Sequence, residues 1–166
     1  MVKYFYKSLR SQSMQQLSEY KRGVWVYAEA PSADEIQALT DAFDLELGIA
    51  LDALDENEMP RLEKGGEQNY IFVRYARKDG EGGLETMPLL FVFAAGAVIT
   101  ISPTKLPCID KFLKGKIDFA TTQRTKLILQ ILNEIVEGFD GLITQKSKQI
   151  KAIRARLRGQ EITDQD

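Results

Sequence analysis

The chain has 166 residues, 44% hydrophobic and 28% charged, with a formal net charge of −2, which suits one globular domain with a substantial core and gives no general attraction to nucleic acid. It has no histidine and a single cysteine, Cys108, so histidine-based catalytic or metal sites and internal disulfides are excluded. We expect a cytosolic chain that is not an enzyme and that binds any metal through oxygen atoms.

The first part of the chain predicts two strands followed by a helix. Residues 2–7 mix aromatic and polar side chains, and residues 23–30 are rich in β-branched and aromatic residues, so both favour strands. The N-terminus has no apolar run of signal-peptide length. Ser32 followed three residues later by Glu35 is a capping box that opens a helix. The apolar residues at helical spacing after it are Ile36, Leu39 and Phe43.

A second helix is expected after Asp44. Its apolar stripe is formed by Leu47, Ala50, Leu51 and Leu54. Pro60 marks the end of this helix or a point just beyond it, because proline disfavours the helical conformation in the residue before it. Residues 69–76 then predict another strand, bounded by glycine-containing loops.

The longest apolar run, residues 87–101, predicts a β-hairpin and not a membrane span. It is shorter than the ~18 apolar residues of a spanning helix, and it contains a proline and a glycine. Its two strands, at 89–93 and 98–101, are apolar on both faces, which is typical of a sheet covered by helices on both sides. Residues 1–120 are therefore expected to form an α/β domain, with a mixed β-sheet and helices on both faces (an αβα sandwich).

Residues 121–158 predict one long helix that projects from this domain. Its apolar positions are Ile128, Leu132, Ile135, Phe139, Leu142, Ile143, Ile150, Ile153 and Leu157. A helix of about 35 residues is ~50 Å long, too long to pack entirely on a small domain. We expect it to meet another helix, from another part of a longer protein or from another subunit. Residues 159–166 are polar and are expected to form a disordered tail.

Short motifs from Gly23 onward occur in an order that is specific when they are taken together. A strand with Trp25 precedes the capping-box helix, and after it come Leu51-Asp52-Ala53-Leu54, Met59-Pro60-Arg61-Leu62-Glu63 and Tyr70-Ile71-Phe72. This order resembles the CorA family of divalent metal transporters, whose pattern is W-[IV]-x, L-E-D-[IA]-L, [RQ]-P-[KR]-[VIL]-E and an aromatic strand. The sequence departs from that pattern at Leu51, which stands where the family has a glutamate. It also lacks the family's G-M-N signature and its two spanning helices.

The resemblance implies that the chain is the cytoplasmic soluble domain of a CorA-like Mg²⁺/Co²⁺ transporter. Residues 121–158 would then lead towards a stalk and pore, whose missing C-terminal helices alone would cross the inner or plasma membrane. In the family, soluble domains form an intracellular funnel within a homo-oligomer, a pentamer at full length, and can sense the metal. The resemblance implies no required cofactor beyond a regulatory Mg²⁺ or another divalent ion, and no nucleic-acid partner.

Asp52 and Asp55 are the candidate metal ligands. They lie three residues apart on the polar face of the second expected helix, with Glu56 and Glu58 nearby. Magnesium keeps several waters and often needs only one or two carboxylates. By resemblance, Asp52 matches an aspartate that in some members helps to bind a regulatory ion between subunits. The alternative is a solvated helix face, and residues 59–63 are either a subunit contact or a helix stop that leads into the next strand.

A basic run without an acidic residue lies near the end of the long helix. It consists of Lys146, Lys148, Lys151, Arg154, Arg156 and Arg158. The run predicts contact with anionic lipid or with an acidic partner helix, or a solvated face near a helix C-terminus, where cations suit the helix dipole. Aromatic residues do not interleave with these charges, so nucleic acid is not expected. The alternative function is a stand-alone cytosolic interaction module that docks a partner through its long helix.

Overall fold

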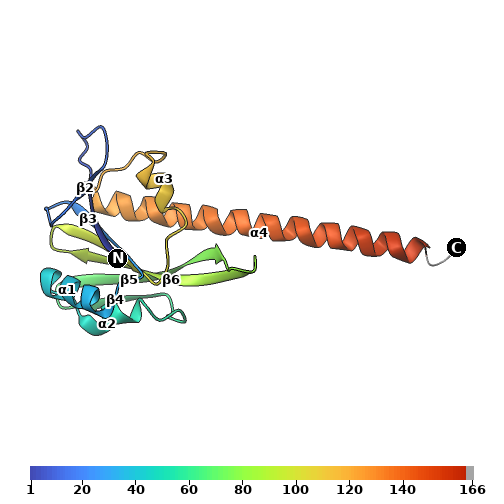
Figure 1. Ribbon diagram of the computed structural model, residues 1–166, viewed down its shortest axis with the longest axis horizontal. Coiled ribbons are helices and arrows are strands. Elements are labelled where there is room, and N and C mark those ends of the chain that lie inside the picture. Colours follow the sequence, from blue (N-terminus) through green and yellow to red (C-terminus); the bar gives the residue numbers. More distant parts are fainter. Residues whose placement is uncertain (164–166) are drawn as a thin grey trace.

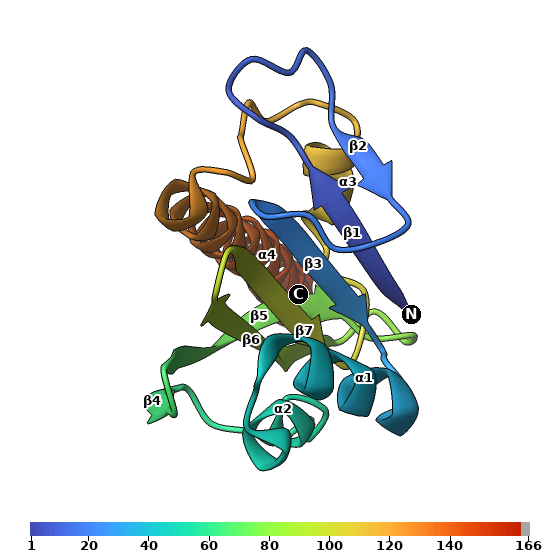
Figure 2. The ribbon, with the colours of Figure 1, turned by 90° about the vertical axis from the view of Figure 1, so that its left-hand side faces the viewer.

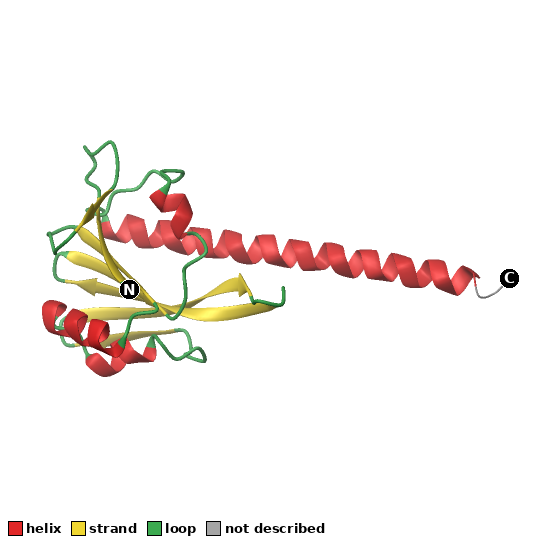
Figure 3. Ribbon diagram, viewed as in Figure 1, coloured by secondary structure: helices red, strands yellow, loops and turns green. Residues whose placement is uncertain are grey.

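The computed structural model describes residues 1–163, which form a seven-stranded sheet, three short helices and one long projecting helix (Figures 1 and 3). The elements are β1 (Val2–Tyr6), β2 (Gln15–Leu17), β3 (Val24–Glu29), α1 (Ala33–Phe43), α2 (Leu47–Asp52), β4 (Arg61–Gly65), β5 (Gln68–Lys78), β6 (Leu84–Ala94), β7 (Ala97–Ser102), α3 (Ile109–Leu113) and α4 (Arg124–Thr163). The strand order is β2-β1-β3-β7-β6-β5-β4. Strands β3 and β7 pair in parallel and the other neighbours pair antiparallel, so the expected mixed sheet is confirmed.

Helices cover both faces of the sheet, which confirms the expected αβα sandwich (Figure 2). Helices α1 and α2 lie on one face, and α3 and the first part of α4 lie on the other. Strand β3 contributes side chains to the core on each face of the sheet. Trp25 and Tyr27 belong to the core under α3 and α4, whereas Val24 and Val26 belong to the core under α1 and α2. Side chains alternate along a strand, so a strand buried on both sides must be apolar throughout.

Helix α1 anchors the first layer and begins where the sequence predicts. The Ser32 Oγ accepts a hydrogen bond from the Glu35 N–H at 3.2 Å, and the Glu35 Oε2 accepts one from the Ser32 N–H at 2.9 Å. The capping box is therefore confirmed. The buried residues of α1 are Ile36, Leu39 and Phe43, as expected.

Helix α2 is shorter than the apolar spacing predicts and ends at Asp52. Of the expected stripe only Ala50 is buried, whereas Leu47 and Leu51 are exposed and Leu54 lies beyond the helix. The physical reason is length: a helix of six residues makes fewer than two turns and cannot present four apolar side chains on one face. Asp52 consequently lies at the helix end, beside the loop that leads to β4.

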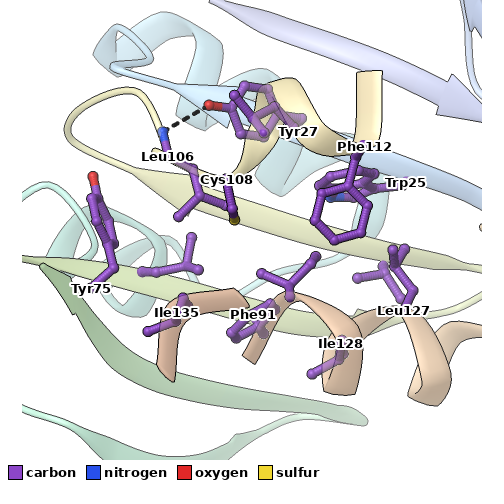
Figure 4. Packing of buried hydrophobic residues seen from close by; sticks show 14 of the residues in the cluster. Trp25, Tyr27, Tyr75, Phe91, Leu106, Cys108, Phe112, Leu127, Ile128 and Ile135 are labelled. Carbon is purple, nitrogen blue, oxygen red and sulfur yellow. Dashed lines mark hydrogen bonds between the residues drawn. The ribbon is translucent and has the colours of Figure 1, made fainter. Parts of the chain in front are cut away.

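The core of the second layer is aromatic and centres on Trp25. Its fully buried ring packs edge-on against Phe112 and Phe119, with ring centroids 5.6 and 6.1 Å apart. The indole Nε1 donates a hydrogen bond to the Thr100 Oγ1 at 2.9 Å. Figure 4 shows Phe112 of α3 and Leu127 of α4 gathered around this ring. One tryptophan thus joins the sheet to both helices of this layer.

Three short elements, β2, β4 and α3, were not predicted, and two strands are longer than predicted. Strand β5 extends over Gln68–Lys78 and β6 over Leu84–Ala94. Strand β6 contains Pro88, which lacks an N–H for the ladder. Its partner β7 pairs only with residues 90–94 of β6, so no hydrogen bond to β7 is lost at the proline.

Helix α4 starts three residues after the predicted start and projects far beyond the sheet (Figures 1 and 3). Its first part is docked through Leu127, Ile128, Ile131 and Ile135, which are buried in the core. The helix continues to Thr163, past the expected end at residue 158. The tail that we expected to be disordered from residue 159 is therefore helical at its start. Residues 164–166 lie outside the described part. No helix in residues 1–163 is long and apolar enough to cross a bilayer.

Candidate functional site

The two predicted metal ligands lie in and after α2, in the segment that leads to β4. Asp52 is the last residue of α2, and Asp55 lies in the turn that follows. The backbone N–H of Asp55 donates to the carbonyl of Asp52 at 3.0 Å, so the two residues belong to one tight turn. The chain then enters β4 at Arg61, which was expected only as a residue of a helix stop or contact loop.

Arg61 is the centre of the charge network in this segment. Its Nη2 donates to the Asp52 Oδ2 at 2.8 Å, and its Nε donates to the Glu63 Oε2 at 2.9 Å. Its Nη1 forms a third ion pair, with Glu58. The guanidinium therefore directs each of its three nitrogens at a different carboxylate, which uses the fork geometry that distinguishes arginine from lysine.

The strand geometry of β4 explains why these groups meet. Arg61 pairs across the ladder with Phe72 of β5, and its guanidinium carbon lies 4.1 Å from the centre of the Phe72 ring. Cross-strand neighbours of this kind interact directly, and a cation over an aromatic face is favourable. Glu63 lies two residues further along β4 and thus on the same face as Arg61. Helix α2 packs on that face and brings Asp52 to them.

Asp55 has a different role from Asp52. Its Oδ1 accepts a hydrogen bond from the Asn57 N–H at 2.9 Å, which stabilises the turn. Arg74 of β5 donates to the backbone carbonyls of Glu56 and Glu58. The structure thus separates the two predicted ligands into an ion pair and a turn, and nowhere in residues 1–163 are three acidic or cysteine side chains grouped so that they could hold a metal ion.

The electrostatics agree with this geometry. The hydrogen bond with Glu63 is the largest influence that raises the pKa of Arg61, followed by that with Asp52, and burial acts in the opposite direction. The Arg61 side chain is 30% exposed and that of Asp52 48%, so the network is open to solvent and is screened by salt. In this arrangement the carboxylate of Asp52 is matched to a guanidinium.

Sequence reasoning missed the importance of Arg61. The acidic residues around Asp52 were considered as ligands or as a solvated helix face, although a cation occurs among them. The alternation of Arg61 and Glu63 around the exposed Leu62 was the available signal, because in a strand it places the two charges on one face. The partnership with Asp52 depends on the closure of the loop after α2, which the sequence does not reveal.

A second candidate surface runs along α4. Five large apolar residues on it are exposed at intervals of seven: Leu129, Val136, Ile143, Ile150 and Leu157. Such spacing is typical of the seam that one helix offers to another in a coiled coil. The seam continues along α4 beyond the end of the sheet (Figure 1).

The family model described as "CorA-like Mg²⁺ transporter protein" matches residues 20–166. The chain belongs to this family. A sequence search of curated proteins finds no match. The family assignment confirms the resemblance seen in the motifs from Gly23 onward, and it holds for nearly the whole chain.

Solved structures of CorA proteins share the fold. The soluble domain of CorA from Methanocaldococcus jannaschii superposes with a TM-score of 0.80 at 17% identity, covering 95% of this chain and 64% of that domain. The complete CorA magnesium transporter of the same organism gives a TM-score of 0.78 at 20% identity, covering 95% of this chain and 51% of that one. The cytoplasmic domain of ZntB from Vibrio parahaemolyticus gives 0.67 at 10% identity, with coverages of 86% and 60%. The chain thus spans about half the length of the complete archaeal protein.

Proposed function

We propose that this chain is the cytoplasm-facing soluble domain of a transporter for Mg²⁺ or a similar divalent ion such as Co²⁺. The observation that carries the proposal is the family match over residues 20–166, together with a fold in which one long helix leaves an α/β domain. The likeness to a CorA soluble domain supports the same fold assignment. The membrane location belongs to the longer protein, at an inner or plasma membrane.

The role that we propose for the domain is structural, without catalysis. Subunits of a homo-oligomer, a pentamer at full length, would place their α/β domains side by side as an intracellular funnel. Helix α4 would connect each domain to the rest of the protein. The exposed seam of α4 supports this proposal, because five large apolar side chains in one row favour packing against another helix.

A regulatory ion at Asp52 and Asp55, shared with a second subunit, stays an untested prediction. The contacts do not favour it, since the Asp52 carboxylate is paired with Arg61 and the Asp55 carboxylate stabilises a turn. The proposal for this segment is therefore that ion pairs within the chain hold α2 against β4. The alternative of a stand-alone interaction module is not favoured by the family match.

A chimera tests the proposal. Residues 1–163 replace the matching part of the Methanocaldococcus jannaschii transporter, and Mg²⁺ uptake into liposomes is followed with an enclosed magnesium dye. We expect uptake above that of protein-free liposomes and competition by Co²⁺. The control carries an unrelated soluble domain of similar size. A chimera that inserts and assembles but conducts no better than this control would contradict the proposal, and would favour the interaction module.

A further inference from the structure

The cluster around Arg61 is more acidic than its single cation balances. Three carboxylates, from Asp52, Glu58 and Glu63, converge on one guanidinium. They come from three separate segments: the end of α2, the following loop and strand β4. An ion that joined these segments would hold α2 against the sheet edge, and here a side chain of the protein does so.

We infer that Arg61 is the built-in cation of this cluster, so that the domain does not bind divalent ions through Asp52. The inference rests on the proposed function only in that it concerns the divalent ions which the longer protein is proposed to transport. The contacts that carry it are independent of transport: the 2.8 Å ion pair to Asp52, the 2.9 Å ion pair to Glu63 and the 4.1 Å approach to Phe72.

A free ion competes poorly with this arginine for two reasons. The guanidinium is attached to the backbone of β4 and seated on the Phe72 ring, so its effective concentration at the carboxylates is on the order of mM or more. A divalent ion that reached Asp52 would also lie within a few ångströms of the displaced guanidinium, where like charges repel. Magnesium in addition gives up its waters reluctantly.

Removal of the arginine charge should reverse this preference. In Arg61→Met the apolar stem still covers Phe72, but the carboxylates of Asp52, Glu58 and Glu63 lose the cation that they share. Their mutual repulsion destabilises the segment, and a divalent ion relieves it. Weak oxygen-ligand Ca²⁺ sites in proteins have dissociation constants of about 10⁻⁴ to 10⁻³ M, and we expect the variant to fall in this range.

The experiment compares thermal unfolding of the chain in 10 mM CaCl₂ or MgCl₂ with unfolding in NaCl of the same ionic strength. The wild type should show no difference between the salts. Arg61→Met should unfold at a lower temperature in NaCl and recover by roughly 3–5 °C in the divalent salt, the shift expected for an ion at about ten times its dissociation constant. Asp52→Asn added to Arg61→Met should remove most of the recovery.

Arg77→Met is the matched control. Arg77 is as exposed as Arg61, 31% against 30%, but it pairs with a single carboxylate, that of Glu85 at 2.9 Å. Its loss should lower the unfolding temperature without creating a response to divalent ions.

Two results would overturn the inference. One is a wild-type chain whose unfolding temperature rises with Mg²⁺ or Ca²⁺, or whose titration with either ion shows a heat of binding, when this effect is absent in Asp52→Asn. This readout stays valid even where Arg61→Met does not fold. The other is a folded Arg61→Met that responds to divalent ions no more than Arg77→Met. Both results are measured on the isolated domain, so they do not depend on whether the chimera takes up Mg²⁺. A chimera without uptake would contradict the proposed function and would not affect the inference about Arg61.

Discussion

Replacing Ile131 by alanine tests whether α4 is held only by its first part. Ile131 is fully buried between α4 and the sheet, whereas Ile150, on the same helix, is 52% exposed. Both changes remove the same three carbon atoms from a helical residue, so Ile150→Ala is a matched control. Any effect of helix propensity is shared, since alanine is favoured over isoleucine by a few tenths of a kcal/mol in either place.

The expected costs differ by several kcal/mol. At Ile131 the three carbons contribute about 2–2.5 kcal/mol of transfer free energy, at about 0.8 kcal/mol per buried carbon. The cavity left in a core of fixed strands and a straight helix adds to this, and the total loss of unfolding free energy is about 3–4 kcal/mol. At Ile150 no cavity forms, and the change should stay within about 0.5 kcal/mol.

Urea denaturation followed by the fluorescence of Trp25 measures both variants. With a denaturant slope of about 2 kcal/mol per M, the midpoint of Ile131→Ala should fall by about 1.5–2 M, with the slope unchanged. The midpoint of Ile150→Ala should remain within about 0.3 M of the wild type. Equal losses in the two variants would refute the assignment of the docked and free parts of α4.

Three further predictions concern single contacts. Thr100→Val keeps the shape of the side chain but leaves the buried Trp25 N–H without its acceptor, so urea denaturation should show a loss of about 1–3 kcal/mol, and Thr100→Ser should lose clearly less. The amino-terminal ammonium, and then the Ser32 N–H, hold the pKa of Glu35 below its usual range. The ionised Glu35 therefore stabilises the fold fully above its ordinary pKa, and this stabilisation is lost as pH falls through the lowered value. Glu35→Gln should flatten the dependence of the unfolding temperature on pH in that acid range. Burial raises the pKa of Cys108 to about 12, so only about one thiol in 10⁴ is ionised at pH 8; the native chain should react with Ellman's reagent far more slowly than the urea-unfolded chain, and equal rates would contradict its burial.

The sequence predicts the helices and strands whose hydrophobic periodicity matches their burial. It misses the elements whose periodicity is reversed or that are too short to show one. Strand β4 turns its one large apolar residue, Leu62, outward with 74% exposure, while Arg61 and Glu63 face the α1–α2 layer. The usual alternation, with apolar residues inward and polar residues outward, is therefore reversed in β4, and pairing with β5 decides the outcome. Strand β2 has three residues and α3 has five, lengths at which tertiary contacts outweigh local propensity.

The candidate site divides in the same way. Asp52 was found because a motif marks it, and its place on the second helix needed only helix spacing. Its ion-pair partner, Arg61, lies nine residues later in a strand that was not predicted. The contact requires three things together: the early end of α2, the closure of the loop and the side-chain parity of β4. Periodicity within single elements cannot supply a relation between them.

The projecting part of α4 makes the molecule a lever. The whole helix, with 40 residues, is about 60 Å long, and the part beyond Gln149, the last residue beside the β5–β6 hairpin, accounts for about 21 Å of it. A rotation of about 5° of this part would move the far tip by about 2 Å, enough to make or break a side-chain contact. Small adjustments beside the β5–β6 hairpin are therefore enlarged at the distant end of the helix.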